Sequence, residues 1–335
     1  ANWSLTSLNK QCNVLIIDGS NIYAGTPLRV YVSSNNGQNW SQMGTDSVVA
    51  IWGLAKSGNN IFAGSEGRGV YRTTNNGVNW VRVLASVSVS SLAINGNYVF
   101  AGDWGNSRVW VSSNNGSNWD SISLYSGNAP VFCLAVKNNI VFAGTDNYGV
   151  FVTTNNGANW TQTSLNIASI NCFAVSGNNI FAGELFYQKG VYLSTNDGVS
   201  WIHKNQGMVG ERVWSLTSNT QYIFAGTDNS VWRRSITEIV GVQNISTETP
   251  SKYSLSQNYP NPFNPVTKIR FSVPQVRHLF GGSSPRGLGG DLVQLKVYDV
   301  MGREVQTLVN ERLQPGTYET TFDGSMLNSG VYFYK

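Results

Sequence analysis

An eight-residue pattern that recurs five times constrains this chain more than any other feature. Each copy begins with Ser or Thr, has Asn two positions later, Gly two positions after that and Trp three positions beyond the Gly. Asn and Gly between apolar runs favour a hairpin turn, because Gly adopts positive φ without a clash and Asn tolerates it. We therefore interpret each copy as a structural hairpin corner. The corner residues are Asn35, Gly37, Trp40, Asn75, Gly77, Trp80, Asn114, Gly116, Trp119, Asn155, Gly157, Trp160, Asn196, Gly198 and Trp201.

A second pattern, the triplet Phe-Ala-Gly, recurs six times, with Tyr in place of Phe in the first copy. The triplets end at Gly25, Gly64, Gly102, Gly144, Gly183 and Gly226, with spacings of 39, 38, 42, 39 and 43 residues. A period of about 40 residues with four short strands per unit is typical of propeller blades, and no segment has a helical period. We predict an all-β fold in which residues 1–235 form a six-bladed β-propeller with four-stranded antiparallel blades.

The two ends of the repeat region suggest how the ring closes. The sixth copy has three strands and no corner after Ser235, whereas Ala1–Leu5 matches the second half of a corner and an outer strand. We therefore predict that the N-terminal strand completes the last blade and leaves no exposed edge. Because the chain opens abruptly at Ala1, we also expect that a leader has been removed or the N-terminus trimmed.

The lengths of the connections predict where a ligand binds. The turns between the first and second strands and the corners have constant lengths, whereas the other two connections vary between copies. Strands alternate in direction, so the variable loops open on one face, and variable loops on a rigid scaffold commonly carry binding sites. The candidate ligand-binding residues on this loop face are Arg68, Trp104, Arg108, Tyr125, Tyr148, Phe186 and Tyr187.

The composition excludes several classes of protein. Charged residues make up only 12% of the chain and aromatic residues another 12%, which is typical of an uncharged, extracellular β-rich surface. The net charge of +4 is spread along the chain, so the sequence lacks the basic stripe of a nucleic-acid-binding protein. No run of 18 apolar residues is present, and no transmembrane segment is expected.

The sequence offers few groups for catalysis. Three cysteines are too few for a disulfide framework, and Cys133 and Cys172 are interpreted as small core residues. Neither His203 nor His278 has metal-ligand spacing, so we predict no metal, cofactor or catalytic residue. A glycosidase would need two nearby carboxyl groups, and a sialidase would need an arginine cluster. Arg29 and Arg108 occupy equivalent positions in two copies, but a third arginine is missing there.

The corners resemble the Asp-box, or BNR, repeat of sialidases, sortilin-like receptors and photosystem assembly factors. The resemblance covers residues 1–235 and implies a β-propeller, but it does not specify a function. This chain has Asn where Asp gives the motif its name, which keeps the hydrogen-bond acceptor and removes the charge.

The remainder of the chain departs from the repeat. Residues 236–252 are rich in Ser, Thr, Glu and Pro and are interpreted as a linker. Residues 253–335 contain a proline-rich block followed by alternating apolar segments, which predicts a small immunoglobulin-like β-sandwich. The expected strands are Lys268–Val273, Val293–Tyr298, Glu304–Leu308, Thr317–Phe322 and Val331–Tyr334.

This second domain resembles the C-terminal sorting domain of type IX secretion, which is found in Bacteroidetes. The resemblance rests on five ordered blocks: Pro260–Pro265, Leu295–Asp299, Gly302–Val305, Pro315–Tyr318 and Ser329–Tyr332. It implies a location outside a Gram-negative cell, secreted or on the outer surface, and the secretion machinery as a partner. The long Gly-rich loop between Val276 and Asp291 departs from the family, and the resemblance implies a further strand after Lys335, so we expect the sandwich to be incomplete at its C-terminus.

Together these features predict a secreted or cell-surface propeller that acts as a non-catalytic binding or adhesion module for a glycan or a protein. Loops and exposed aromatic residues are sufficient for that role. Two alternatives stay open, a structural subunit of a surface layer or filament and a sialidase-like glycoside hydrolase.

Overall fold

The computed structural model describes most of the chain in two compact units, Ala1–Arg233 and Arg234–Lys335. The described residues are 5–44, 48–205, 207–208, 210–239, 241–246, 248–275, 291–324 and 327–335. Most of the predicted closing strand, at residues 1–4, and the Gly-rich loop at residues 276–290 lie outside these ranges.

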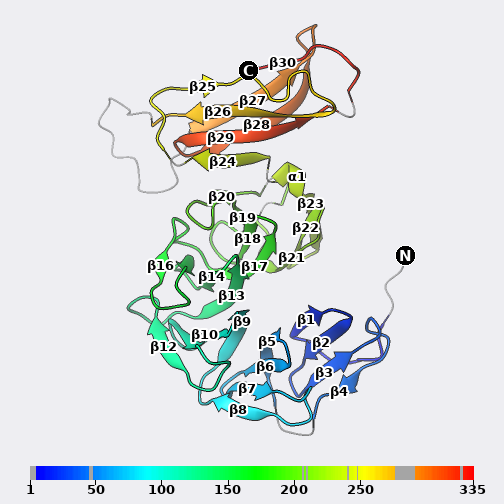
Figure 1. Ribbon diagram of the computed structural model, residues 1–335, viewed down its shortest axis with the longest axis vertical. Helices are drawn as coiled ribbons and strands as arrows, with labels where there is room; N and C mark the ends of the chain where they lie inside the picture. The colour runs from blue at the N-terminus through cyan, green and yellow to red at the C-terminus, as the bar shows by residue number, and fades with distance from the viewer. Residues whose placement is uncertain are drawn as a thin grey trace. The chain divides into compact units, whose positions relative to one another are not determined.

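The first unit consists of six consecutive antiparallel sheets, which we number as blades 1 to 6 in chain order (Figure 1). Blades 1 to 5 have four strands each, and blade 6 has three strands among the described residues. Blade 1 has β1 (Val14–Asp18), β2 (Asn21–Gly25), β3 (Val30–Ser33) and β4 (Ser41–Gln42); blade 2 has β5 (Ile51–Ser57), β6 (Asn60–Ser65), β7 (Gly69–Thr73) and β8 (Val81–Leu84); blade 3 has β9 (Val89–Asn95), β10 (Tyr98–Asp103), β11 (Arg108–Ser112) and β12 (Asp120–Ser123). Blade 4 has β13 (Val131–Lys137), β14 (Ile140–Thr145), β15 (Val150–Thr153) and β16 (Thr161–Gln162); blade 5 has β17 (Ile170–Ser176), β18 (Asn179–Glu184), β19 (Gly190–Ser194) and β20 (Ile202–His203); blade 6 has β21 (Val213–Ser218), β22 (Tyr222–Thr227) and β23 (Val231–Ser235). The prediction of an all-β fold with four-stranded antiparallel sheets is confirmed.

The core of this unit lies between neighbouring blades. The first strand of each blade faces the inner side of the arc and packs against the first strand of the next blade (Figure 1). Between blades 1 and 2, for example, buried Tyr23 and Val30 meet Leu54, Ile61 and Trp80. Blades 2 to 5 therefore bury both faces against their neighbours, and blades 1 and 6 each bury one, as expected for sheets that cannot bury an apolar face alone.

The predicted closure of the ring falls mostly on residues 1–4 and is outside the described part of the chain. Leu5, the last residue of the predicted closing strand, is exposed and belongs to no strand. Leu15 in β1 is 59% exposed, whereas the equivalent Leu54 of blade 2 is 4% exposed. Val231 of blade 6 is also exposed, so the outer faces of the first and last blades carry apolar side chains that no described residue covers.

The recurring Phe-Ala-Gly triplet holds one blade against the next. Phe62 is fully buried, and a Cβ atom on Gly116, in the corner of the following blade, would lie 2.7 Å from its ring. Gly116 also has a φ of 81°, which favours glycine for a second reason. The Gly of the triplet makes room as well, because a Cβ atom on Gly25 would lie 2.6 Å from Ile51 of the next blade. The Phe of the triplet in one blade thus packs against the Gly of the corner in the next blade, so the two recurring patterns form one contact between blades.

The corners contain the same hydrogen bonds in all five copies. In blade 2, the Thr73 hydroxyl accepts from the Gly77 N–H at 2.9 Å and donates to Asn75 Oδ1 at 2.9 Å. Asn75 Oδ1 also accepts from the Asn79 N–H at 3.0 Å. These bonds satisfy turn N–H groups that the strands leave unpaired.

We predict that Asn75→Ala destabilises the fold without affecting ligand binding. The substitution removes two hydrogen bonds of the corner, so the free energy of unfolding should fall by about 1 kcal/mol. Urea denaturation measures this loss. The matched control is Asn79→Ala, because the corner uses only the backbone N–H of that exposed residue, and equal losses in the two variants would contradict the assigned role.

The second unit is a two-sheet β structure (Figure 1). Its sheets have the orders β24-β29-β26-β25 and β28-β27-β30. Its elements are α1 (Ile236–Ile239), β24 (Val242–Ser246), β25 (Ser254–Leu255), β26 (Val266–Val273), β27 (Asp291–Tyr298), β28 (Glu304–Leu313), β29 (Gly316–Asp323) and β30 (Phe333–Tyr334). Buried and exposed residues alternate along β26, where Ile269, Phe271 and Val273 point into the core. All five strands expected for this domain are present, with boundaries shifted by a few residues.

The structure differs from the sequence interpretation at the stretch 236–252. Helix α1 and strand β24 lie in this supposed linker, and β24 pairs with β29 through the register Val242 to Thr320. Val242 is 2% exposed. The second unit therefore begins at Arg234, because a strand within the polar segment completes the edge of its first sheet.

Candidate functional site

The loop face is built on short turns between the second and third strands of each blade. The residue after each triplet Gly starts this turn with a polar side chain, which is buried in blades 1 to 5 and binds backbone groups. In blade 5, the carboxylate of Glu184 is fully buried and accepts from the N–H groups of Phe186 and Tyr187, both at 2.9 Å. Asp103 in blade 3 accepts from the Gly105 N–H at 2.8 Å. These two carboxylates shape the loops that present the exposed aromatic residues.

Three of the predicted ligand-binding residues lie together on this face. The rings of Tyr125 and Tyr148 are stacked with their centroids 3.9 Å apart. The Tyr187 hydroxyl donates to Asn147 Oδ1, next to Tyr148. We call Tyr125, Tyr148 and Tyr187 the tyrosine cluster. Its members come from the loops of blades 3, 4 and 5, so three blades contribute to one surface.

The tyrosine cluster combines one anchored ring with two exposed rings. The Tyr125 hydroxyl donates to the Ala129 carbonyl at 3.1 Å, and burial raises the pKa of Tyr125 to about 12. Tyr125 therefore stays protonated, and its anchored ring supports the stacked ring of Tyr148. Tyr148 is 40% exposed and Tyr187 57% exposed, so their rings are available to a ligand.

The other four predicted ligand-binding residues are not members of the tyrosine cluster, although Phe186 directly precedes Tyr187 in the same turn. Trp104 is exposed and lies against Phe132, with ring centroids 5.0 Å apart. Arg68 is exposed in the turn before β7, and Arg108 donates to the Ser121 hydroxyl at 3.3 Å at the start of β11. Phe186 is exposed in the turn that Glu184 holds. No described contact joins either arginine to the tyrosine cluster.

Sequence reasoning missed a second set of aromatic residues, Trp52, Phe132 and Trp214. Each follows the first apolar residue of a first strand, and each is the extra residue of a β-bulge. A simple alternation of inward and outward side chains does not reveal such a position, because a bulge changes the direction of its side chain. The signal available in the sequence was the repeated pair of Ile or Val followed by an aromatic residue.

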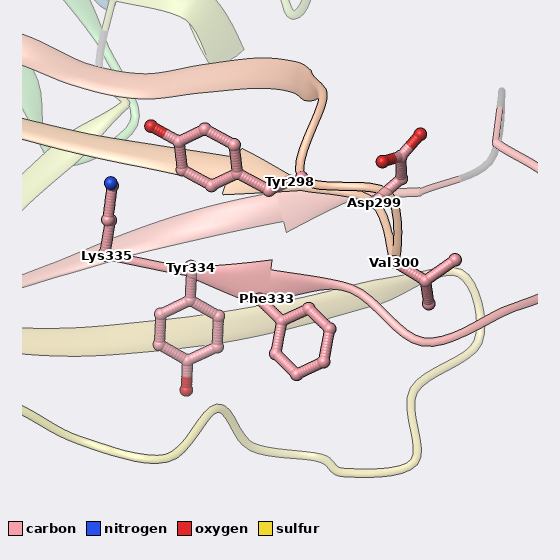
Figure 2. A pocket seen from close by; sticks show the side chains of 7 residues that line it. Tyr298, Asp299, Val300, Phe333, Tyr334 and Lys335 are labelled. Atoms are coloured by element: carbon pink, nitrogen blue, oxygen red, sulfur yellow. The ribbon is translucent and has the colours of Figure 1, made fainter.

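A shallow pocket of about 300 Å³ lies in the second unit, where β27 ends and β30 pairs with it (Figure 2). Lys335 places its ammonium group 5.2 Å from the centre of the Tyr298 ring on one side of β30. The Asp299 carboxylate accepts from the N–H groups of Met301 and Arg303, which lowers its pKa, with the Arg303 backbone bond as the largest cause. The Asp299 carboxylate of this pocket is thus used to hold a turn, and the Lys335 ammonium group is used in a contact with the Tyr298 ring.

Reactive groups are sparse in the described part of the chain. No group of three or more His, Cys, Asp and Glu side chains within those residues could hold a metal ion. Burial raises the pKa of the Cys133 thiol well above its ordinary value, which is consistent with a core residue. Burial lowers the pKa of His203, whose ring packs against Tyr192 at 4.6 Å. None of the helices in the described ranges has the length and apolarity of a membrane span.

Comparison with known families identifies the end of the chain. Residues 257–335 match the family model described as "Secretion system C-terminal sorting domain". This match indicates export by type IX secretion to the cell surface or the extracellular space, as the sequence predicted. No curated protein matches the chain.

Solved structures support the propeller fold. The extracellular domain of the putative hybrid two-component system BT4673 from B. thetaiotaomicron is 18% identical, with a TM-score of 0.58 over 83% of this chain and 41% of that chain. YCF48 from Cyanidioschyzon merolae is 14% identical, with a TM-score of 0.55 over 70% of this chain and 85% of that chain. The GH74 xyloglucanase from Xanthomonas campestris is 11% identical, with a TM-score of 0.54 over 66% of this chain and 44% of that chain.

These comparisons define the architecture and leave the activity open. At identities of 18% or less, the likeness extends to the fold alone. The chain also spans less than half of the BT4673 and xyloglucanase structures. The chain is therefore a propeller followed by a sorting domain, and its function must be argued from its own surface.

Proposed function

We propose that this chain is a binding module, displayed on or released from the cell surface, that holds an extracellular glycan or protein on its loop face without catalysing a reaction. The tyrosine cluster carries this proposal. Its rings come from three blades, so they form a surface that depends on the assembled propeller. The sorting domain supplies the route to the outside of the cell.

The geometry of the cluster suits recognition by contact. Tyr148 rests on the anchored Tyr125, and Tyr187 is fixed through Asn147, so both exposed rings lose little freedom when a ligand binds. Tyrosine offers a large apolar face together with a hydroxyl that can exchange hydrogen bonds. Such residues are common hot spots of binding surfaces.

The carboxylates of the loop face support binding over hydrolysis. A glycosidase requires two carboxyl groups about 5 to 9.5 Å apart that face the substrate. Asp103 and Glu184 are 4% and 0% exposed and bond to loop N–H groups instead. Asp146 accepts from the Ser169 hydroxyl at 2.6 Å. These three carboxylates therefore hold the loops in place.

We predict that the variant with Trp104, Tyr148 and Tyr187 changed to Ala loses binding. The purified wild type should retain specific members of a glycan and protein array, and the triple variant should bind them at least about tenfold more weakly. The control is Trp232→Ala, which removes a partly exposed indole from β23. Equal binding by wild type and triple variant would exclude the tyrosine cluster and Trp104 as the site. Turnover of a bound glycan would favour the hydrolase. Ligand-free self-assembly in light scattering would favour the structural subunit.

A further inference from the structure

A row of equivalent positions follows the inner side of the arc on the loop face. Five of the first strands have a β-bulge near their first residue, and blade 1 has its equivalent residue just before β1. The residues of this row, from blade 1 to blade 6, are Asn13, Trp52, Ser90, Phe132, Asn171 and Trp214. Because neighbouring first strands pack side by side (Figure 1), the row runs from blade to blade around the inner side.

The row alternates between two kinds of residue. Blades 1, 3 and 5 contribute Asn or Ser, whereas blades 2, 4 and 6 contribute Trp or Phe. A second position alternates in the same way. It lies in the turn between the second and third strands, two residues after the Gly of the Phe-Ala-Gly triplet. Even blades have Glu66, Asp146 and Asp228 there, and odd blades have Pro27, Trp104 and Leu185. An aromatic ring and a carboxylate therefore recur together in every second blade.

The small polar residues fix the strands that carry the aromatic residues. Asn13 donates from Nδ2 to the Ile51 carbonyl of blade 2 at 3.1 Å, and Asn171 donates to the Trp214 carbonyl of blade 6 at 2.8 Å. The Ser90 hydroxyl donates to the Val131 carbonyl of blade 4. Each odd blade thus holds the backbone beside the aromatic residue of the following blade, which organises that residue before any ligand arrives.

In blades 2 and 6, the carboxylate bonds to the N–H edge of the indole. The Trp52 indole N–H donates to Glu66 Oε2 at 3.3 Å, and the Trp214 indole N–H donates to Asp228 Oδ1 at 2.7 Å. Trp52 and Trp214 are nevertheless 48% and 47% exposed. Phe132 is half-buried against Trp104. The one polar side-chain atom of each tryptophan is therefore bonded, and the rest of each indole is apolar.

We propose that Trp52, Phe132 and Trp214 form a second binding site, for an uncharged oligosaccharide, separate from the tyrosine cluster. A sugar ring has an apolar C–H face and a rim of hydroxyl donors. An aromatic face with a carboxylate at its edge matches both features, because the ring covers the C–H face and the carboxylate accepts from the rim. The inference rests on the proposed function and deepens it, because it names the class of ligand and a second set of residues on the loop face.

Charge favours a neutral ligand over a cationic one. A cation binds over the face of an aromatic ring, whereas these carboxylates lie in the plane of the rings that they bond. Asp228 is also neutralised by Arg212, whose Nε lies 3.0 Å from its Oδ2. An anionic sugar would meet the remaining carboxylates of the even blades. An uncharged chain meets no such repulsion.

The test is a titration of the full chain with hexasaccharides of β-1,4-linked glucose, mannose and xylose, followed by tryptophan fluorescence and calorimetry. Hexalysine and hexagalacturonate serve as the cationic and anionic probes. At least one uncharged hexamer should bind, and Trp52→Ala and Trp214→Ala should each weaken it about tenfold. Trp52→Phe should retain most of the affinity, which separates loss of the ring face from general damage. Trp232→Ala, in the same blade as Trp214, should bind as the wild type does.

The other outcomes overturn the inference in distinguishable ways. Preferred binding of hexalysine that Glu66→Gln abolishes would identify a site for basic peptides instead. Sugar binding that disappears only in Tyr148→Ala and Tyr187→Ala would leave the proposed function intact and remove this second site. Failure of every uncharged hexamer to bind would remove it as well, while the array of proteins and other glycans still tests the loop face.

Discussion

Trp80→Ala is expected to lower the free energy of unfolding by about 3–5 kcal/mol. Trp80 is 7% exposed and packs in the apolar layer between blades 1 and 2. Its indole N–H also donates to the Met43 carbonyl of the preceding blade at 3.2 Å. The substitution therefore creates a large cavity and leaves a carbonyl without its partner, and both effects weaken the contact between two blades.

Urea denaturation of the purified chain measures this effect, with Val81→Ala as the control. Val81 is the next residue and is 62% exposed, so its truncation should change the free energy of unfolding by less than about 0.5 kcal/mol. A Trp80→Ala variant as stable as the wild type would show that the corner tryptophan does not join the blades. Binding at the loop face should be unchanged in the folded fraction, because Trp80 lies at a corner and not in a variable loop.

The features of this fold that could be predicted are those encoded locally. The hydroxyl, Asn and Gly of a corner are close in sequence and bond to one another, so one copy predicts all five. The triplet could be recognised as a marker by its period. Its physical role could not, since Phe62 meets Gly116 only when two blades are packed together.

Features that depend on distant pairing could not be predicted. The strand Val242–Ser246 has the polar composition of a linker, and its partner β29 is far away in the chain. The tyrosine cluster is an intermediate case. Exposed aromatic residues in variable loops were predictable, but only the structure brings Tyr125 and Tyr148 into a stack. The bulged positions of Trp52 and Trp214 required the register of the strands.

Deletion of residues 234–335 is expected to abolish export while leaving the propeller folded. These residues form a compact unit of their own and include the whole segment that matches the sorting domain. In a bacterium with type IX secretion, the full chain with a suitable leader should reach the surface or the medium, and the truncated chain should stay in the periplasm. Cell fractionation and protease digestion measure location and folding. The variant with Trp104, Tyr148 and Tyr187 changed to Ala is the control and should be exported normally.

The boundary of the exported signal can be tested with two fusions to a periplasmic reporter, one that carries residues 234–335 and one that carries residues 253–335. The longer fusion includes β24, which pairs with β29 along Val242–Ser246 and buries Val242. The shorter fusion exposes the edge of β29, so it should be less resistant to protease and exported less efficiently. Equal export and equal resistance of the two fusions would show that the segment 236–252 acts only as a linker.

The deletion experiment has its own contradicting outcome. Finding the propeller outside the cell after deletion of residues 234–335 would show that the second unit is not the export signal of this chain. The second unit would then have to be considered as a further binding domain.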